Sequence, residues 1–171
     1  MRVAVFGVHG RMGSEVCRAV TLSPDLELVA GLNAGDSRKE ARKAEVVIDF
    51  THPDSVMDNV LWCIENGRHV VVGTSGFTEQ RYDQVRQWLG PDPSVGVLVA
   101  ANFSIGAVLM MHFAQIAARH YESVEVVELH HPSKVDAPSG TGVSTAEQIA
   151  AVRAEAGLGP VPDATVQELP G

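Results

Sequence analysis

Close to its N-terminus the chain reads VAVFGVHGRMG over residues 3–13. An apolar strand pattern runs into three glycines spaced three apart, Gly7, Gly10 and Gly13. A helical pattern follows from Arg11, which can add a charge-assisted contact to an anion. Glycines at such a turn let the backbone approach a pyrophosphate, and the N–H groups that open the next helix point at its charge. The strand–loop–helix context therefore favours a dinucleotide-binding loop over a tight turn without a ligand.

Strand and helix patterns alternate over the first hundred residues. We expect strands at 2–6, 26–32, 45–50, 69–72 and 95–99, helices at 11–22, 53–67 and 78–89, and a short polar helix or loop at 37–44. Strands that are continuous apolar runs, separated by helices, are typical of a parallel sheet covered on both faces. The sequence therefore predicts an α/β fold with a Rossmann-like, doubly wound parallel sheet.

The pattern changes after Val99. A long helix is expected at 104–119, a strand of alternating apolar and charged residues at 122–130, and a further helix at 140–154. We place a domain boundary near residue 101, so that residues 1–101 form a dinucleotide-binding domain and residues 102–171 form part of an α+β substrate and oligomerisation domain. A single strand has no partner for its backbone groups. We therefore expect the second domain to be incomplete and the natural protein to continue past residue 171.

Composition narrows the classes of partner. The 171 residues carry a net charge of −8, which argues against nucleic acid or an anionic membrane as the main partner. No apolar run approaches the roughly 18 residues of a membrane-spanning helix. Cys17 and Cys63 lie within helical patterns and have no metal-binding spacing, and unpaired cysteines suit a reducing cytoplasm. A local cluster of cationic groups and N–H donors can still bind an anionic small molecule.

Proton donors gather in the second part of the chain. His130, His131 and Lys134 lie within five residues, and a helix start follows at Gly140 and Thr141. Lys134 can deliver a proton if burial or a nearby cation lowers its pKa, and one histidine can share that work or hold a carboxylate. The N–H groups of Gly140 and Thr141 can bind a second carboxylate. A solvated basic loop beside a capped helix is the alternative, but the cluster favours a site for a dianion next to a proton donor.

The choice between NADH and NADPH stays open. Asn33 lies about 20 residues after the glycine loop, where an acidic residue would favour NAD. A neutral side chain does not repel a 2′-phosphate, and His9 and Arg11 lie on the loop nearby. The loops at 49–53, 73–77 and 101–104 follow predicted strands, where small residues let a nicotinamide ring lie close to the backbone.

Five blocks of this sequence resemble the 4-hydroxy-tetrahydrodipicolinate reductase (dihydrodipicolinate reductase) family. They are VFGVHGRMG at 5–13, VIDFT at 47–51, GTSGF at 73–77, NFSIG at 102–106 and ELHHPSKVDAPSGT at 128–141. The blocks follow in order over nearly the whole chain, and the last is highly specific. The resemblance implies reduction of a dicarboxylate intermediate of diaminopimelate and lysine biosynthesis by NADH or NADPH, in a cytoplasmic homotetramer.

The resemblance also implies roles for individual residues. His130 is similar to the family's proton donor/acceptor and Lys134 to its proton donor. The substrate carboxylates would be bound by His131, Gly140 and Thr141. The cofactor would be bound at its pyrophosphate by Gly7, Val8, His9, Gly10, Arg11 and Met12, near its adenosine ribose by Asn33, and around its nicotinamide by Gly73, Thr74, Ser75, Ala100, Ala101, Asn102 and Phe103. No metal ligand is implied.

Three departures and two alternatives accompany this resemblance. Asn33 stands where the family usually has an acid, and Ser75 replaces a common threonine. The family also runs on well beyond residue 171, and we expect the missing part to complete the second domain. One alternative function is a nucleotide-binding fragment or regulatory module without turnover. The other is a different two-domain NAD(P)-dependent dehydrogenase, against which the cluster of His130, His131 and Lys134 argues.

Overall fold

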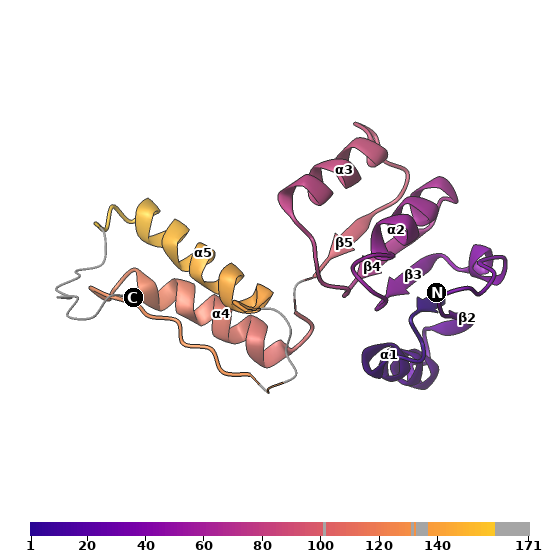
Figure 1. The fold of residues 1–171 in the computed structure, drawn as a ribbon, viewed down its shortest axis with the longest axis horizontal. Coiled ribbons are helices and arrows are strands. Elements are labelled where there is room, and N and C mark those ends of the chain that lie inside the picture. The colour runs from indigo at the N-terminus through magenta and orange to yellow at the C-terminus, as the bar shows by residue number, and fades with distance from the viewer. Residues whose placement is uncertain (101, 131, 133–136, 160–171) are drawn as a thin grey trace. The chain divides into compact units, whose positions relative to one another are not determined.

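The structure is a computed structural model that describes residues 1–100, 102–130, 132 and 137–159. The chain divides into two compact units, Met1–Ala101 and Asn102–Gly171 (Figure 1). None of the helices in the described ranges combines the length and the apolar character that crossing a membrane requires.

The first unit is built on a five-stranded sheet in the order β2-β1-β3-β4-β5, and every neighbouring pair is parallel. The strands are β1 (Arg2–Phe6), β2 (Glu27–Leu32), β3 (Val46–Asp49), β4 (His69–Val72) and β5 (Val97–Val99). This confirms the predicted Rossmann-like α/β fold. The chain moves from β1 to one side and then returns to the other, so the strand order reverses between β1 and β3. In such sheets ligands bind at the carboxyl ends of the strands beside this reversal.

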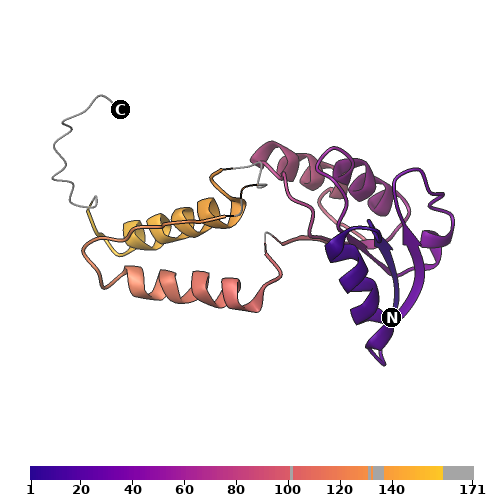
Figure 2. The ribbon, with the colours of Figure 1, turned by 60° about the horizontal axis from the view of Figure 1, so that its bottom comes forward.

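Helices cover both faces of the sheet (Figures 1 and 2). Successive side chains of a strand point to opposite faces, so Val3 and Val5 pack with Val20 of α1 (Arg11–Leu22). On the other face Ala4 and Phe6 join the core formed with α2 (Val56–Glu65) and α3 (Glu79–Leu89). The two buried clusters fix β1, and the loop that follows it, at the centre of the unit.

Several boundaries differ from those expected. The helix predicted from residue 53 begins at Val56, because a turn precedes it in which the N–H groups of Ser55 and Val56 donate to the His52 carbonyl. The polar stretch at 37–44 forms a short 3-10 helix, η1 (Glu40–Lys43). The last strand of the sheet spans 97–99 rather than 95–99.

The second unit contains α4 (Ile105–Ala118) and α5 (Gly140–Glu155), which lie side by side in both ribbon views. Ala118 packs against Ile149 and Val152 of α5, with Val124 at the edge of this cluster. The Arg153 guanidinium donates to the carbonyls of Ala118, Tyr121 and Glu122, and so ties the end of α4 to α5.

The strand predicted at 122–130 is wrong for this structure, which assigns no strand there. A strand is defined by a ladder of hydrogen bonds to a neighbouring extended segment. No such ladder is present for 122–130 in the part of the chain that the structure describes. Much of the apolar surface of α4 is likewise exposed, at Ile105, Val108, Leu109, Phe113 and Ile116.

Candidate active site

The glycine loop after β1 is closely packed against its surroundings. Gly7 has φ +86°, and a Cβ atom there would lie 2.2 Å from the Phe50 carbonyl oxygen. A Cβ atom on Gly13 would lie 2.0 Å from the Gly7 carbonyl oxygen. Side chains are therefore excluded at both positions, and the first turn of α1 is drawn against the end of β1. Gly10 is the N-cap of α1 and provides no capping side chain, which leaves the first-turn N–H groups available to an anion.

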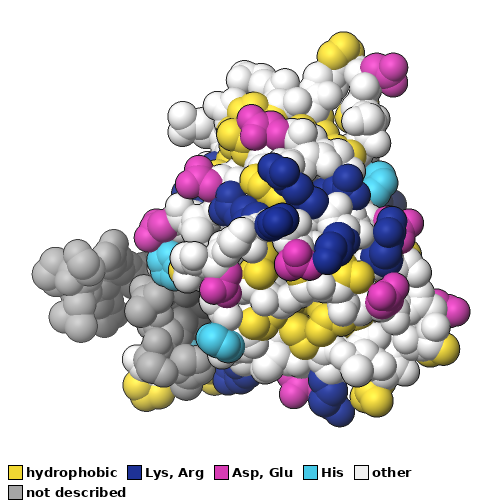
Figure 3. Space-filling model, turned by 90° about the vertical axis from the view of Figure 1, so that its right-hand side faces the viewer, with side chains coloured by type: hydrophobic (Ala, Val, Ile, Leu, Met, Phe, Trp, Pro, Cys, Tyr) yellow, Lys and Arg dark blue, Asp and Glu magenta, His cyan; other side chains and the backbone are white. Residues whose placement is uncertain are grey.

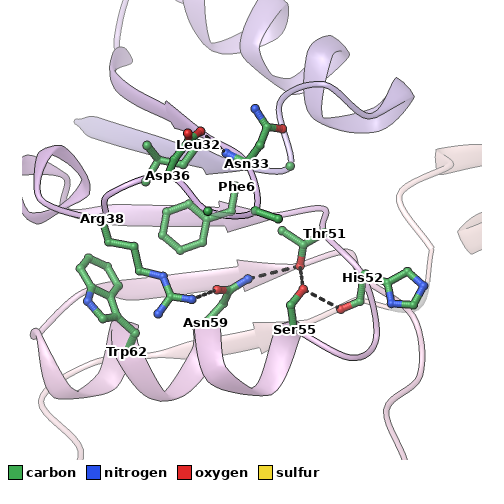
Figure 4. A pocket seen from close by; sticks show the side chains of 13 residues that line it. Phe6, Leu32, Asn33, Asp36, Arg38, Thr51, His52, Ser55, Asn59 and Trp62 are labelled. Carbon is green, nitrogen blue, oxygen red and sulfur yellow. Dashed lines mark hydrogen bonds between the residues drawn. The ribbon is translucent and has the colours of Figure 1, made fainter.

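A pocket of about 640 Å³ adjoins this loop at the carboxyl ends of β1, β2 and β3 (Figure 4). This volume lies within the range of small-molecule sites. The aromatic rings of Phe6 and Trp62 form part of the wall, and hydroxyl groups of Thr51 and Ser55 another part. The remaining lining residues are Gly7, Leu32, Asn33, Ala34, Gly35, Asp36, Arg38, His52 and Asn59.

Asn33 connects the turn after β2 to the glycine loop. Its side-chain oxygen accepts the His9 backbone N–H at 3.0 Å, and its own backbone N–H donates to the Asp36 carboxylate at 2.8 Å. The side-chain oxygen of Asn33 is bound to the loop, and its NH₂ group is the donor that it can offer to a ligand. Asn33, the residue expected near the adenosine ribose, lines the pocket.

Arg38 was not anticipated from the sequence, where it belongs to a polar stretch that reads as surface. Its guanidinium carbon lies 6.0 Å from the centre of the Phe6 ring and 5.9 Å from that of Trp62, close enough for cation–π attraction. Its Nη2 donates to Asn59 Oδ1 at 2.5 Å. Among the described lining residues it is the one Lys or Arg. The sequence did contain one signal for this role, since an arginine a few residues after the second strand can lie beside the adenosine ribose.

A fully buried carboxylate, Asp49 at the end of β3, organises the loops beside the pocket. It accepts hydrogen bonds from Asn59 Nδ2 at 2.7 Å, from Thr74 Oγ1 at 2.6 Å and from Thr51 Oγ1 at 2.8 Å. Such bonds are required for a buried polar group to be tolerated. Asp49 thus links the loops after β3 and β4 to α2, and through Asn59 to Arg38.

Cys63 lies close to this carboxylate and is also fully buried. Burial, reinforced by the negative charge of Asp49, raises the pKa of the Cys63 thiol to about 12. The thiol is therefore protonated at neutral pH and is not a nucleophile candidate. Both cysteines are free, and within the described ranges no group of three or more His, Cys, Asp and Glu side chains could hold a metal ion.

In the second unit His130 and the start of α5 are joined by Glu128. His130 Nε2 lies 3.3 Å from a Glu128 carboxylate oxygen. The same carboxylate accepts the backbone N–H of Ser139 at 2.8 Å and the Ser139 hydroxyl. Ser139 is the N-cap of α5, directly before Gly140 and Thr141. Glu128, which the sequence block at 128–141 contains but to which no role was given, therefore links His130 to the residue that precedes Gly140 and Thr141.

The remaining predicted site residues have separate placements. Gly73, Thr74 and Ser75 follow β4, and only Thr74 of these three is buried. Asn102 Nδ2 donates to Thr141 Oγ1 at 3.1 Å, and its side-chain oxygen accepts the Ser104 N–H at 2.8 Å. Ala100 is half-buried and Phe103 exposed. Three predicted site residues lie outside the described residues, namely Ala101, His131 and Lys134.

Positive charge is locally concentrated although the whole chain has a net charge of −8. Figure 3 shows Lys and Arg side chains gathered over the middle of one face, with acidic side chains around them. An acidic protein of this kind can therefore present a surface that attracts an anion.

The glycine cradle, the adjoining pocket and the reversal of strand order define a nucleotide-binding protein of the Rossmann class. A more specific assignment comes from family models. The model "Dihydrodipicolinate reductase, N-terminus" matches residues 1–103, and "Dihydrodipicolinate reductase, C-terminus" matches residues 106–168. The chain belongs to the dihydrodipicolinate reductase family, which confirms the resemblance inferred from its sequence blocks.

Individual relatives agree with the family models. The chain is 59% identical over 171 residues to a 4-hydroxy-tetrahydrodipicolinate reductase of Cutibacterium acnes, and 60% identical to one of Thermobifida fusca. Each match covers 100% of this chain and 70% of the relative.

Solved structures give the same fold. A dipicolinate-bound dihydrodipicolinate reductase from Paenisporosarcina sp. TG-14 superposes with a TM-score of 0.75 at 33% identity, covering 98% of this chain and 72% of that one. A myo-inositol 2-dehydrogenase from Lactobacillus plantarum, at a TM-score of 0.54 and 11% identity over 70% of this chain and 42% of that one, shares the fold alone.

Proposed function

We propose that this chain reduces 4-hydroxy-tetrahydrodipicolinate to tetrahydrodipicolinate with NADH or NADPH, a step of diaminopimelate and lysine biosynthesis. One observation carries the proposal. This chain combines a closely packed glycine loop suited to a dinucleotide with a histidine, His130, that Glu128 links to the start of α5. Identities near 60% to reductases with this name support the choice of substrate.

The residues of the first unit fit a nicotinamide dinucleotide. The cradle at Gly7 and Gly13 has no room for side chains, and the adjoining pocket of about 640 Å³ can take the adenosine half. Asn33 would donate a hydrogen bond to the adenosine ribose. Arg38 would contact the 2′-phosphate that this ribose carries in NADPH. The pyrophosphate would be held by Gly7, Val8, His9, Gly10, Arg11 and Met12, and the nicotinamide bordered by Gly73, Thr74, Ser75, Ala100 and Ala101. Asn102 and Phe103, the first two residues of the second unit, complete the proposed nicotinamide set. When bound, the reduced cofactor supplies the hydride.

The second unit supplies acid–base chemistry and anion binding. The reaction replaces the 4-hydroxyl group of the substrate by hydrogen and releases water, so it consumes a proton as well as a hydride. We assign the delivery of this proton to Lys134, with His130 as donor/acceptor partner. The two substrate carboxylates would be held by His131 and by the N–H groups of Gly140 and Thr141. Helix N–H groups in the first turn have no intrahelical acceptor, which suits them to a carboxylate.

The proposal includes a cytoplasmic location and a homotetramer. Two free cysteines suit a reducing compartment. The exposed apolar side chains of α4 are of the kind that subunit interfaces cover. Light scattering of the purified chain would measure the number of subunits.

A coupled assay tests the reaction. Dihydrodipicolinate synthase generates the substrate, and the loss of reduced-nicotinamide absorbance reports turnover. We expect His130→Ala and Lys134→Ala each to lower kcat at least about tenfold, or about 1.4 kcal/mol in the barrier. His120→Ala, which changes an exposed histidine at the end of α4, is the matched control and should retain the wild-type rate.

Two outcomes would contradict the proposal. Binding of NADPH without any substrate reduction would point to a nucleotide-binding module. Wild-type rates in both His130→Ala and Lys134→Ala would remove these residues from the mechanism.

A further inference from the structure

Among the described residues of the second unit, Glu128 has three hydrogen-bonding contacts, and they use both of its carboxylate oxygens. One oxygen accepts the Ser139 backbone N–H at 2.8 Å. The other accepts the Ser139 hydroxyl and lies 3.3 Å from His130 Nε2. Because the Glu128 side chain is only 27% exposed, these partners replace much of its contact with water.

Local geometry explains how one carboxylate reaches both partners. Glu128 and His130 are two residues apart, and the contact between the Glu128 carboxylate and His130 Nε2 shows that their side chains lie on the same side of the backbone. Ser139 is buried as the N-cap of α5, and its Oγ accepts the Gly142 N–H at 3.0 Å. Glu128 therefore braces the first turn of α5 through Ser139 while it contacts the imidazole of His130.

The charge of Glu128 suits both contacts. The hydrogen bonds from Ser139, and more weakly the one with His130, lower the pKa of the Glu128 carboxyl below its ordinary value. A carboxylate near a helix N-terminus is stabilised by the helix dipole. A carboxylate hydrogen-bonded to a histidine fixes the ring orientation and tautomer, and it stabilises the imidazolium form.

We propose that Glu128 is a positioning residue. It orients the His130 ring for proton transfer, and it fixes the first turn of α5 for binding a substrate carboxylate. This inference rests on the proposed function, since it gives Glu128 a purpose in the same reaction. The bonds described for Glu128 use Ser139 and His130, and they do not use the N–H groups of Gly140 or Thr141. No group among the residues that the structure describes accepts these two N–H groups, so they can bind the substrate while Glu128 fixes the turn that carries them.

The first experiment measures the contact itself and does not depend on turnover. In wild-type protein labelled with nitrogen-15, the chemical shifts of the His130 ring nitrogens report which of them carries a proton. We expect Glu128→Gln to change these shifts. Glu125→Gln is the matched control, because it removes an exposed carboxylate from the same segment, and it should leave them unchanged. Unchanged His130 shifts in Glu128→Gln would overturn the proposal.

The second experiment is a double-mutant cycle on kcat. We expect Glu128→Gln to lower kcat about tenfold in the wild-type background, as the loss of an oriented acid–base group would. In a His130→Ala background the same change should cost less than about twofold, because residues that act together give non-additive effects. Equal losses in the two backgrounds would show that Glu128 does not act through His130.

Controls separate this inference from folding and from the proposed function. NADPH affinity, to which the proposed function gives Glu128 no contribution, should be the same in Glu128→Gln and wild type. Glu128→Asp keeps the charge and should recover part of the lost kcat. If the wild-type chain does not reduce the substrate at all, the proposed function fails while the nitrogen-15 shifts still decide whether Glu128 holds His130.

Discussion

Asp49 and Glu128 show how single carboxylates organise each unit. Asp49 is fully buried and joins Thr51, Thr74 and Asn59, while Glu128 joins His130 to the cap of α5. Neither residue belongs to the glycine loop or to the histidine–lysine cluster that the sequence makes conspicuous. Their partners come from different elements, so their importance depends on tertiary contacts that residue spacing alone does not reveal.

Arg38, which lines the pocket beside Asn33, should affect the two cofactors differently. We expect Arg38→Ala to weaken the binding of NADPH about tenfold and that of NADH far less, because a guanidinium beside the ribose site would contact the 2′-phosphate. Titration of the fluorescence of each reduced cofactor measures both affinities. Lys39→Ala, at the exposed neighbouring position, is the control. Equal weakening of both cofactors would exclude a role for Arg38 in recognising the phosphate.

The elements whose signals are local were predictable from the sequence. The bounds of α1 and β4 agree with those expected, and the Thr78 hydroxyl caps α3 by accepting the Arg81 N–H. Periodicity and caps act within a few residues, which explains this success. The strand expected at 122–130 failed because a strand requires a neighbouring strand, and its own alternation does not supply one.

Some residues of the candidate site likewise have local sequence signals, and others depend on contacts between distant parts of the chain. Glycines after the first strand and an asparagine after the second were visible as patterns, and the structure places Asn33 in the pocket wall beside Gly7. Arg38 was missed because its aromatic neighbours Phe6 and Trp62 lie far from it in the sequence. Glu128 could have been found, since the rule that sends residues i and i+2 of an extended segment to one side pairs it with His130.

The close contact between the glycine loop and α1 leaves no room for a side chain at Gly13. Gly13→Ala would place a methyl group 2.0 Å from the Gly7 carbonyl, so either the loop or the helix must shift. We expect the free energy of unfolding to fall by about 1–3 kcal/mol, as overpacking does elsewhere, and dinucleotide binding to weaken with it. Urea denaturation and cofactor titration measure the two effects. Ser14→Ala, one residue further along α1, should change neither, and a wild-type affinity in Gly13→Ala would show that the loop does not form the cofactor cradle.

We propose that the two units carry different parts of one reaction. The first has a Rossmann-like fold and a closely packed glycine loop, and to the second we assign the acid–base residues and the helix start that would bind carboxylates. Both family models are present in one chain, which spans 70% of the length of its relatives from C. acnes and T. fusca. The central claim is therefore transfer of a hydride to a cyclic dicarboxylate, which neither a nucleotide-binding module nor an anion-binding unit would perform alone.

The most direct measurement follows that hydride. NADPH carrying deuterium at the transferable position of its nicotinamide is incubated with the chain and the product of dihydrodipicolinate synthase, and the tetrahydrodipicolinate formed is analysed by mass spectrometry. We predict that the product gains one deuterium per molecule in step with the cofactor oxidised. A product without deuterium, or cofactor that binds and is never oxidised, would contradict the assignment of this chain as a reductase.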